Sequence, residues 1–484
     1  MYVVLGKWVH YLGNHLIGGI WKMTEERKKL KKSSSPAKDL TVGSPMKLIL
    51  GFAFPMFLGL LFQQFYSLVD TMIVGKYLGV DPFAGVGSTG SLNFIVIGFC
   101  MGLCSGFSVP ISQSFGAKDF PMLRKMVTNS VWLCTFFSVV ITTLMLVFCR
   151  PVLTLMNTPE NIFEYAYIYI FIIFAGIPCT ILYNMTAAIL RALGDSKSPI
   201  IFLAISSAIN IGLDLLLIIV FRMGVEGAAL ATVVSQGVSG VISIIYIKKK
   251  FDILAMEKGD WKLERHLAGK LTGVGIPMGL QYSITGIGSV ILQTAVNGLG
   301  SIYVASMTAG SKINIFLACP FDALGQTMAP YAGQNIGARK LDRVGKGLRA
   351  ACIIGFIVSG LMVVVVKLFG DQLTMLFLDE KDPVIMQNST LFLIIVSAFY
   401  CLLTLVNTVR FTIQGMGFSS LAIIAGVMEM IARGIAGMLL VPAFGYLGAC
   451  YSSPLAWLLA DAFLIPAFFL CKRKVARQLE VEKA

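Results

Sequence analysis

The stretch FPMFLGLLFQQFYSLVDTMIVG, residues 54–75, is long and apolar enough to cross a lipid bilayer as one helix, because a spanning helix needs about 20 apolar residues. Its only charged residue is Asp70. A charged side chain at the centre of a bilayer costs roughly 2.5–3.5 kcal/mol, so such a residue needs a reason to be there. The stretch therefore predicts a membrane-spanning helix that carries part of a functional site.

A second copy of this pattern lies in the later part of the chain. FPMFLG at Phe54 matches IPMGLQ at Ile276, which gives Pro55 and Pro277 equivalent positions in their helices. Further matches are Pro110 with Pro330, QSFGAK at Gln113 with QNIGAR at Gln334, ILRALGDS at Ile189 with TIQGMGFS at Thr412, and MGVEGAA at Met223 with FGYLGAC at Phe444. The shift stays within 220–223 residues, which predicts two homologous halves. The paired prolines predict symmetric bends, or hinges, where a helix lines a cavity.

The composition extends this interpretation to the whole chain. Of its 484 residues, 56% are hydrophobic and 13% are charged, whereas soluble domains carry about 25% charged residues. Apolar stretches occur at residues 46–73, 86–113, 122–149, 163–190, 198–221, 225–247, 268–297, 302–331, 345–369, 388–415, 419–441 and 446–471. The predicted fold class is an all-α polytopic membrane protein with twelve transmembrane helices in two pseudo-symmetric six-helix bundles. Six spans return the chain to its starting side, so the repeat is parallel, and such transporters bind substrate between their halves.

The spans divide the chain into a tail at 1–45, an N-terminal bundle at 46–247, a linker at 248–267, a C-terminal bundle at 268–471 and a tail at 472–484. Residues 1–22 lack a small-residue cleavage site, so we interpret them as an upstream extension and not as a signal peptide. The charged, Ser-rich residues 24–45 predict a mobile tail. Most of the 39 lysines and arginines lie on one side if both termini are cytoplasmic, which predicts that orientation in the plasma membrane. The net charge of +14 therefore reflects topology and does not indicate nucleic-acid binding.

Sequence motifs for other chemistries are absent. The chain has no GxxxxGK[ST] nucleotide-binding loop, no HExxH or GxSxG motif and no Cys/His metal-binding spacing. We therefore expect a protein that is not an enzyme and that needs no cofactor. A channel is a further possibility from hydropathy alone, but it would not require a duplicated, proline-bent pair of halves.

Charged residues at membrane depth are the candidates for function. The acids there are Asp70, Asp214, Asp322, Glu429 and Asp461, and the bases are Lys312, Arg410 and Arg433. This excess of acids favours a cationic substrate over a phosphate-bearing one.

Helical spacing predicts one pocket in the first half. Gln63 and Asp70 share a helix face, and Asn210 and Asp214 share another. If these helices pack with the sixth span, the pocket would be lined by Asp70, Asn210, Asp214 and Thr232. Sodium would take such oxygens as ligands, whereas burial would let one carboxylate carry a proton. The alternative is a polar cluster that only holds the helices together.

Substrate contacts are predicted in both halves. In the first half, Gln63 and Tyr66 lie beside the predicted pocket. In the second half, Asp322 follows a proline and could contact a substrate amine. Glu429 and Arg433 stand four residues apart, which predicts an intrahelical ion pair or, alternatively, a substrate site or gate.

Several motifs together resemble the multidrug and toxic compound extrusion (MATE) family. They are SLVDTMIVGKYLG at 67–79, SFGAKD at 114–119, RALGDSKSP at 191–199 and IGARKLD at 336–342, and the resemblance covers about residues 40–472. It implies a V-shaped exporter of organic cations that works by sodium or proton antiport. It also implicates a helix 1 Asp, a helix 5 Asn-x-x-x-Asp and a helix 6 Thr, which match Asp70, Asn210, Asp214 and Thr232. One branch of the family uses an acid in helix 7, but residues 277–286 contain none.

The predicted function is secondary active export of cationic drugs by alternating access, in exchange for H⁺ or Na⁺. The main alternative is a flippase of lipid-linked oligosaccharide or another amphiphile, which would need a basic cavity. The partners that we expect are small cationic or amphiphilic molecules and the lipid bilayer, and we expect the protein to act as a monomer.

Overall fold

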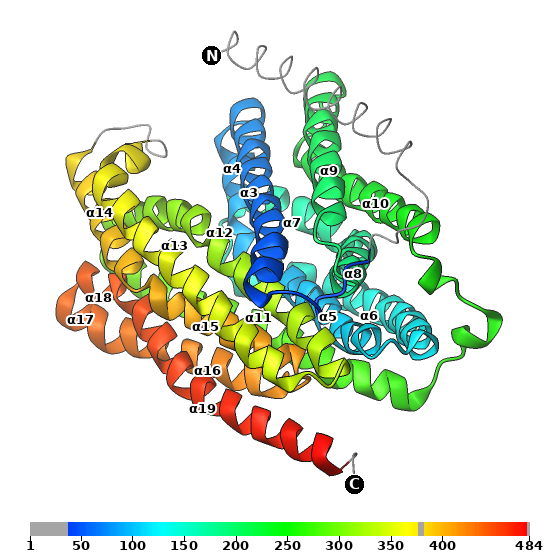
Figure 1. Ribbon diagram of the computed structural model, residues 1–484. Coiled ribbons are helices and arrows are strands. Elements are labelled where there is room, and N and C mark those ends of the chain that lie inside the picture. The colour runs from blue at the N-terminus through cyan, green and yellow to red at the C-terminus, as the bar shows by residue number, and fades with distance from the viewer. Residues whose placement is uncertain (1–36, 376–381, 482–484) are drawn as a thin grey trace, which may run out of the picture.

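The computed structural model describes residues 37–375 and 382–481, in which every regular element is a helix (Figure 1). The first half contains α3 (Pro45–Leu78), α4 (Val80–Ser88), α5 (Gly90–Gly116), α6 (Phe120–Leu155), α7 (Glu160–Ala175), α8 (Ile177–Ala192), α9 (Ser198–Asp214), the π-helix η2 (Leu215–Val220) and α10 (Val225–Lys250). The linker forms the short helices η3 (Asp252–Leu254) and η4 (Lys258–Trp261). The second half contains α11 (Arg265–Asn297), α12 (Ser301–Gly337), α13 (Leu341–Met375), α14 (Pro383–Ala398), α15 (Tyr400–Gly415), α16 (Ser420–Ile435), the π-helix η5 (Ala436–Leu440), α17 (Val441–Phe444), α18 (Tyr446–Cys450) and α19 (Ser452–Val481).

These helices make twelve candidate spans within the described residues. Ten are long and apolar enough to cross a membrane, and two bent pairs bring the number to 12. The pairs are α7–α8, bent by 49°, and α14–α15, bent by 52°. Their breaks, at Gly176 and Phe399, lie at equivalent places in the repeat, as do the π-helices η2 and η5. The predicted fold of two pseudo-symmetric six-helix bundles is confirmed.

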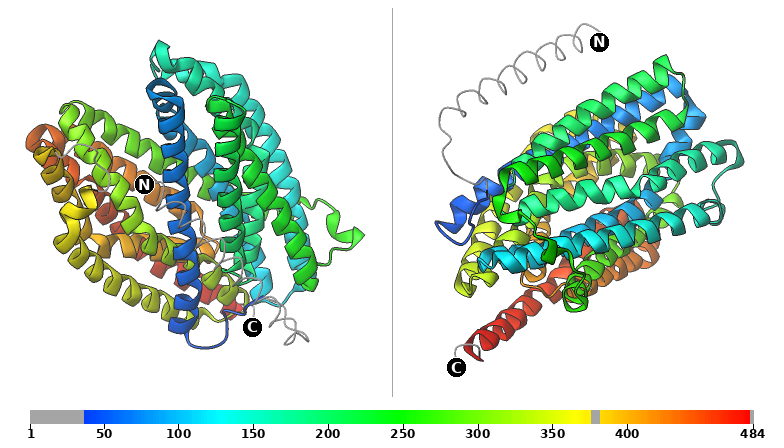
Figure 2. Two further views of the ribbon diagram at one scale, coloured as in Figure 1. Left: turned by 90° about the horizontal axis from the view of Figure 1, so that it is seen from above. Right: turned by 90° about the vertical axis from the view of Figure 1, so that its right-hand side faces the viewer.

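Besides contacts of α3 and α5 with α12, the halves meet mainly along a seam where α5 packs against α11 (Figures 1 and 2). The two helix backbones approach closely because both carry glycines there. A Cβ atom on Gly106 would lie 2.4 Å from the Cα atom of Gly275, and one on Gly102 would lie 2.5 Å from the carbonyl oxygen of Met278. Small residues permit this close packing inside a membrane, where no hydrophobic force drives helices together.

The halves also close on each other where α5, α8, α12 and α15 end. Gln113 Nε2 donates to the carbonyl oxygen of Gly415 at 3.1 Å, and Gln334 Nε2 donates to that of Ala192 at 2.8 Å. Gln113 and Gln334 are partners in the sequence repeat. The two bonds are therefore pseudo-symmetric, and each joins one half to the other. We call this pair of bonds the glutamine clasp.

Residues 37–44 dock across this closure, although the sequence analysis predicts a mobile tail there. The Lys38 N–H donates to the carbonyl oxygen of Leu193 at 2.9 Å, and the Leu40 N–H donates to Gln334 Oε1 at 2.8 Å. Leu40 is buried. Backbone hydrogen bonds to buried partners hold this segment, a feature that its polar composition does not reveal.

The linker packs against α6 of the first half. Arg124 Nε donates to Asp260 at 2.9 Å, and the Glu264 N–H donates to Asn129 Oδ1 at 2.9 Å. The N–H of Glu257, and then Arg124, hold the pKa of the Asp260 carboxyl below its ordinary value. The linker is thus a fixed part of the surface at the closed end.

Several element boundaries differ from those predicted, two of them most clearly. The chain turns at Gly79, with φ +90°, and α4 precedes the predicted start of the second span at residue 86. Helix α19 continues to Val481, past the boundary predicted at 471. Hydropathy falls where a helix leaves the bilayer, whereas the helix itself can continue. The extension predicted at 1–22 lies outside the described residues.

Because α5 and α11 touch at glycines, a larger side chain at this contact should destabilise the protein more than the same side chain elsewhere. Gly106→Val should destabilise the protein by about 1–3 kcal/mol, because the new side chain must push α5 away from α11. The thermal midpoint of the detergent-purified variant measures this cost. Gly360→Val is the control, since a Cβ atom there meets nothing within 4 Å. Equal midpoints for the two variants would show that the seam is not tightly packed.

Candidate functional site

Asp70 of α3 and Asp214 of α9 face each other inside the first half. Their carboxyl groups lie close enough for a hydrogen bond when one carries a proton. Asp214 is fully buried, and so is Asn210 one turn earlier. Asn210 Nδ2 donates to Thr232 Oγ1 of α10 across a long 3.4 Å. The four residues predicted for the ion site are therefore brought together by three helices.

Four buried oxygens at this site have no hydrogen-bond donor among the described residues. They are Asp70 Oδ1, Asn210 Oδ1, Asp214 Oδ1 and Asp214 Oδ2. Leaving a buried acceptor unsatisfied costs about 1–3 kcal/mol, and more for a charged group. The arrangement can relieve this cost by binding a proton or a small cation.

Two tyrosines lie within electrostatic range of both carboxyl groups. Tyr66 comes from α3 and was predicted as a substrate contact, and Tyr169 comes from α7. Tyr169 was not predicted, because it lies in the tyrosine-rich run 165–169, whose spacing does not single it out.

Two adjoining cavities connect this site to the space between the halves. A cavity of about 30 Å³ has Tyr66 and Asn210 in its wall. A second cavity of about 80 Å³, which we call the central cavity, is lined by both halves and includes Tyr282 and Gln326 of the second half. Gln63, Tyr183 and Leu203 line both cavities. A change at the ion site can therefore reach the central cavity through shared side chains.

Arg191 is the only charged residue among those that line the central cavity. The sequence analysis placed it in an inner loop, so it was missing from the bases at membrane depth. In the structure α8 continues to Ala192, and Arg191 lies near Tyr183 and Tyr282. A guanidinium group here can hold an anionic group or stack on an aromatic ring. The excess of acids predicted for the interior therefore does not extend to this cavity.

The predicted ion pair between Glu429 and Arg433 is not formed. Glu429 of α16 pairs instead with Arg410 of α15, and both side chains are buried. Arg433 Nη1 donates to the carbonyl oxygen of Thr285 at 3.1 Å. The two side chains thus contact different neighbouring helices, which residue spacing along one helix cannot reveal. Neither is among the residues that line the central cavity.

The remaining predicted residues, Asp322, Pro55 and Pro277, are not among those that line the central cavity. Asp322 accepts a hydrogen bond from Asn407 at 2.9 Å and lies near Tyr282. Pro55 and Pro277 lie within the continuous helices α3 and α11. The residue after Pro55, Met56, lines the cavity. Their role as hinges stays a prediction.

The second half has no copy of the ion site at the equivalent positions. The shift of 222 residues between Pro55 and Pro277 places Leu292 where the first half has Asp70. The shift between η2 and η5 places Ile435 where it has Asp214. Both substitutes are apolar. The halves share a fold, but the pair of acids Asp70 and Asp214 belongs to the first half alone.

The fold and cavities define a class of protein, a membrane transporter with two pseudo-symmetric halves. It has a cavity lined by both halves and a polar site inside the first half. The MatE family model matches residues 55–216 and 277–439, once in each half. The chain belongs to this family, the MATE transporters.

Similar proteins include named transporters and drug-resistance proteins. The chain is 30% identical to "Probable multidrug resistance protein YoeA" of Bacillus subtilis, over 68% of this chain and 73% of that protein. It is 23% identical to "FAD transporter" of Shewanella oneidensis, over 73% and 78%. It superposes with a TM-score of 0.84, at 23% identity, on an "outward-facing conformation of a multidrug resistance MATE family transporter", over 93% of this chain and 100% of that structure.

The buried ion pair predicts a large effect of removing one partner. Arg410→Met should destabilise the protein by about 3 kcal/mol, because Glu429 would be left as a buried, unpaired charge. Thermal unfolding in detergent measures this. The matched control is Arg150→Met, which breaks the exposed Arg150–Glu164 pair and should change the midpoint little. A buried-pair variant as stable as the control would contradict the pairing described.

Proposed function

We propose that this protein exports amphiphilic organic cations across the plasma membrane in exchange for H⁺ or Na⁺, acting as a monomer with both termini in the cytoplasm. The observation that supports ion exchange is the group of buried oxygens around Asp70 and Asp214 that have no hydrogen-bond donor among the described residues. These oxygens lie beside the small cavity, which shares lining residues with the central cavity. The names of the relatives support drug export.

Either ion would satisfy these oxygens. A proton on one carboxyl group turns that group into a hydrogen-bond donor to the other. Sodium would be held by Asp70 and Asp214, with Asn210 Oδ1 and Thr232 Oγ1 as further oxygen ligands. In both cases the added positive charge removes the repulsion between two carboxylates. The spacing of α3 and α9 then depends on whether the ion is bound.

In the mechanism that we propose, the ion enters from the outside while the glutamine clasp holds the other end closed. Ion binding draws α3 and α9 together and narrows the adjoining cavity through Gln63 and Tyr183, which displaces the substrate outward. The clasp then opens, the ion leaves to the cytoplasm, and a new substrate binds. One-for-one exchange of this ion for a monovalent organic cation moves no net charge, so the membrane potential contributes nothing and the concentration gradient of the ion drives export, at about 1.4 kcal/mol for one unit of pH.

Vesicle transport tests this proposal. Inverted membrane vesicles should accumulate a fluorescent organic cation when a pH or sodium gradient is applied, and the gradient that works identifies the ion. Asp70→Asn and Asp214→Asn should each lower uphill accumulation at least tenfold, because each removes a carboxylate that must titrate or coordinate. Asp81→Asn, at the exposed start of α4, is the control and should keep normal transport.

Two results would contradict this proposal. If both variants at Asp70 and Asp214 retain normal gradient-driven accumulation, the acid pair is a structural cluster. If no gradient drives accumulation in the unmodified protein, the exchange mechanism itself is wrong.

A second candidate function is movement of an anionic amphiphile, which Arg191 favours. A guanidinium group that has electrostatic contact with tyrosines, and that faces the central cavity, suits a phosphate or carboxylate. Arg191→Gln separates the two functions. Cation export should persist in this variant, whereas transport of an anionic amphiphile such as a fluorescent flavin nucleotide should be lost. If Arg191→Gln instead lost cation transport and kept anion transport, a direct role of Arg191 in binding an anion would be rejected.

A further inference from the structure

Asp461 of α19 is a buried acid that the proposed mechanism does not use. It is 3% exposed, and neither of its carboxyl oxygens has a hydrogen-bond donor among the described residues. The nearest opposite charge is Arg410 of α15, which interacts with it electrostatically without forming an ion pair. A carboxylate in this position is paired incompletely, and burial of such a charge is costly.

The guanidinium group of Arg410 has enough N–H donors to pair with two carboxylates, but it forms an ion pair with only one in this structure. It pairs with Glu429 through Nη2, while its own Nε is buried without an acceptor. Arg410 and Asp461 therefore carry complementary groups that are near each other and unused. A small rotation of Arg410 would pair it with Asp461, and a proton on Asp461 would make that pairing unnecessary.

We propose that Asp461 is a second ion-binding site, in the C-terminal half, and that it binds one proton in each transport cycle. This inference rests on the proposed exchange function and adds to it a second coupling ion. A proton fits this place better than sodium does, because sodium requires several oxygen ligands, whereas a proton needs only one of the two Asp461 oxygens that have no partner among the described residues. The site differs from the acid pair of the first half, where the available ligands are oxygens only.

Charged and titratable groups reach the surroundings of Asp461 from several neighbouring helices. Helix α13 presents Cys352, which is in electrostatic contact with Asp461, and Arg349, which lines the same pocket as Cys352 about one turn earlier. Helix α15 presents Arg410, and α16 carries Glu429 and Arg433. Helix α18 carries Tyr446 and Cys450. With Glu429 and Arg410 paired, Asp461 is the group of this set that is left to exchange a proton.

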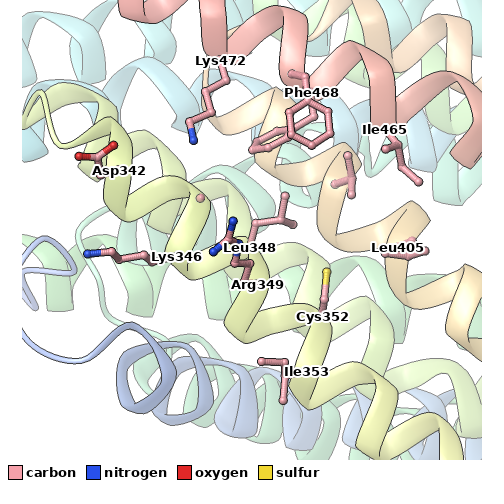
Figure 3. Close-up of a pocket in the computed structure, with 13 residues that line it drawn as sticks. Asp342, Lys346, Leu348, Arg349, Cys352, Ile353, Leu405, Ile465, Phe468 and Lys472 are labelled. Carbon is pink, nitrogen blue, oxygen red and sulfur yellow. The ribbon is translucent and has the colours of Figure 1, made fainter.

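A pocket of about 630 Å³ lies between α13, α15 and α19, toward the end of the molecule where the glutamine clasp lies, and Asp461 is not among its lining residues (Figure 3). Its mouth carries Asp342, Lys346 and Lys472, and its other end reaches Cys352 and Ile465. Ile465 is one helical turn from Asp461, and Cys352 is its electrostatic neighbour. The pocket therefore ends about one helical turn from Asp461, on the side that we propose to be cytoplasmic, and proton exchange requires water to cross that remaining distance.

Helix α15 can couple proton exchange at Asp461 to opening of the glutamine clasp. Arg410 stands little more than one turn before Gly415, the acceptor in one bond of the clasp. Movement of α15 that opens the clasp also moves Arg410 relative to Asp461. If Arg410 approaches Asp461 in the open state, the proton is released into the pocket; if it returns to Glu429, a proton is taken up.

The test is the electrical sensitivity of transport in proteoliposomes. With two cations entering for each monovalent organic cation exported, one net positive charge crosses per cycle, so a potassium diffusion potential of 100 mV should change uphill accumulation severalfold. Asp461→Asn should still accumulate substrate but lose this voltage response, because exchange becomes one for one. Asp461→Glu, which keeps a titratable carboxyl, should retain it. Asp371→Asn, an exposed acid on α13, is the matched control.

The outcomes separate this inference from the proposed function. A voltage response in Asp461→Asn equal to that of the unmodified protein overturns the second site while the first remains. Loss of the response in Asp461→Glu at an unchanged thermal midpoint also overturns it, because a packing role would then explain both variants. Asp70→Asn should instead abolish uphill accumulation altogether, and its failure to do so would reject the first site without affecting Asp461.

Discussion

The structure depends on the cost of leaving carboxyl oxygens unsatisfied in a medium without water. Asp70 and Asp214 would each find donors if they faced solvent, but the helices that carry them place both inside the first bundle. Two carboxylates held together in a low-dielectric site repel strongly, and one positive ion removes the repulsion. In the mechanism that we propose, binding of that ion therefore changes the distance between α3 and α9.

The two homologous halves are the bodies that a change in the spacing of α3 and α9 would move relative to each other. The glycine seam between α5 and α11 allows the halves to pack closely, and the glutamine clasp fixes them at one end by two equivalent bonds. Because the bonds are equivalent, the halves can separate there as two similar bodies. The segment at residues 37–44 adds a further tie between the halves at the same end. In the proposed mechanism, closure at this end leaves the opposite end as the route for the substrate.

Much of this could be predicted from sequence because it depends on local pattern. The twelve spans follow from hydropathy, and the convergence of Asp70 with Asn210 and Asp214 follows from helical spacing plus the order of spans. What could not be predicted depends on tertiary packing. Glu429 is four residues from Arg433, yet pairs with Arg410 on another helix. Arg191 was assigned to a loop because a polar helix end and a loop share the same composition.

The most direct test of whether ion binding moves the two halves is a distance measurement between spin labels at Val80 of the first half and Val384 of the second, which are exposed at the starts of α4 and α14. We predict that the distance distribution in the detergent-purified protein shifts as pH is lowered or sodium is added, and that it stays fixed in the Asp70→Asn, Asp214→Asn double variant. A distribution in the unmodified protein that is the same at every pH and sodium concentration would contradict the account.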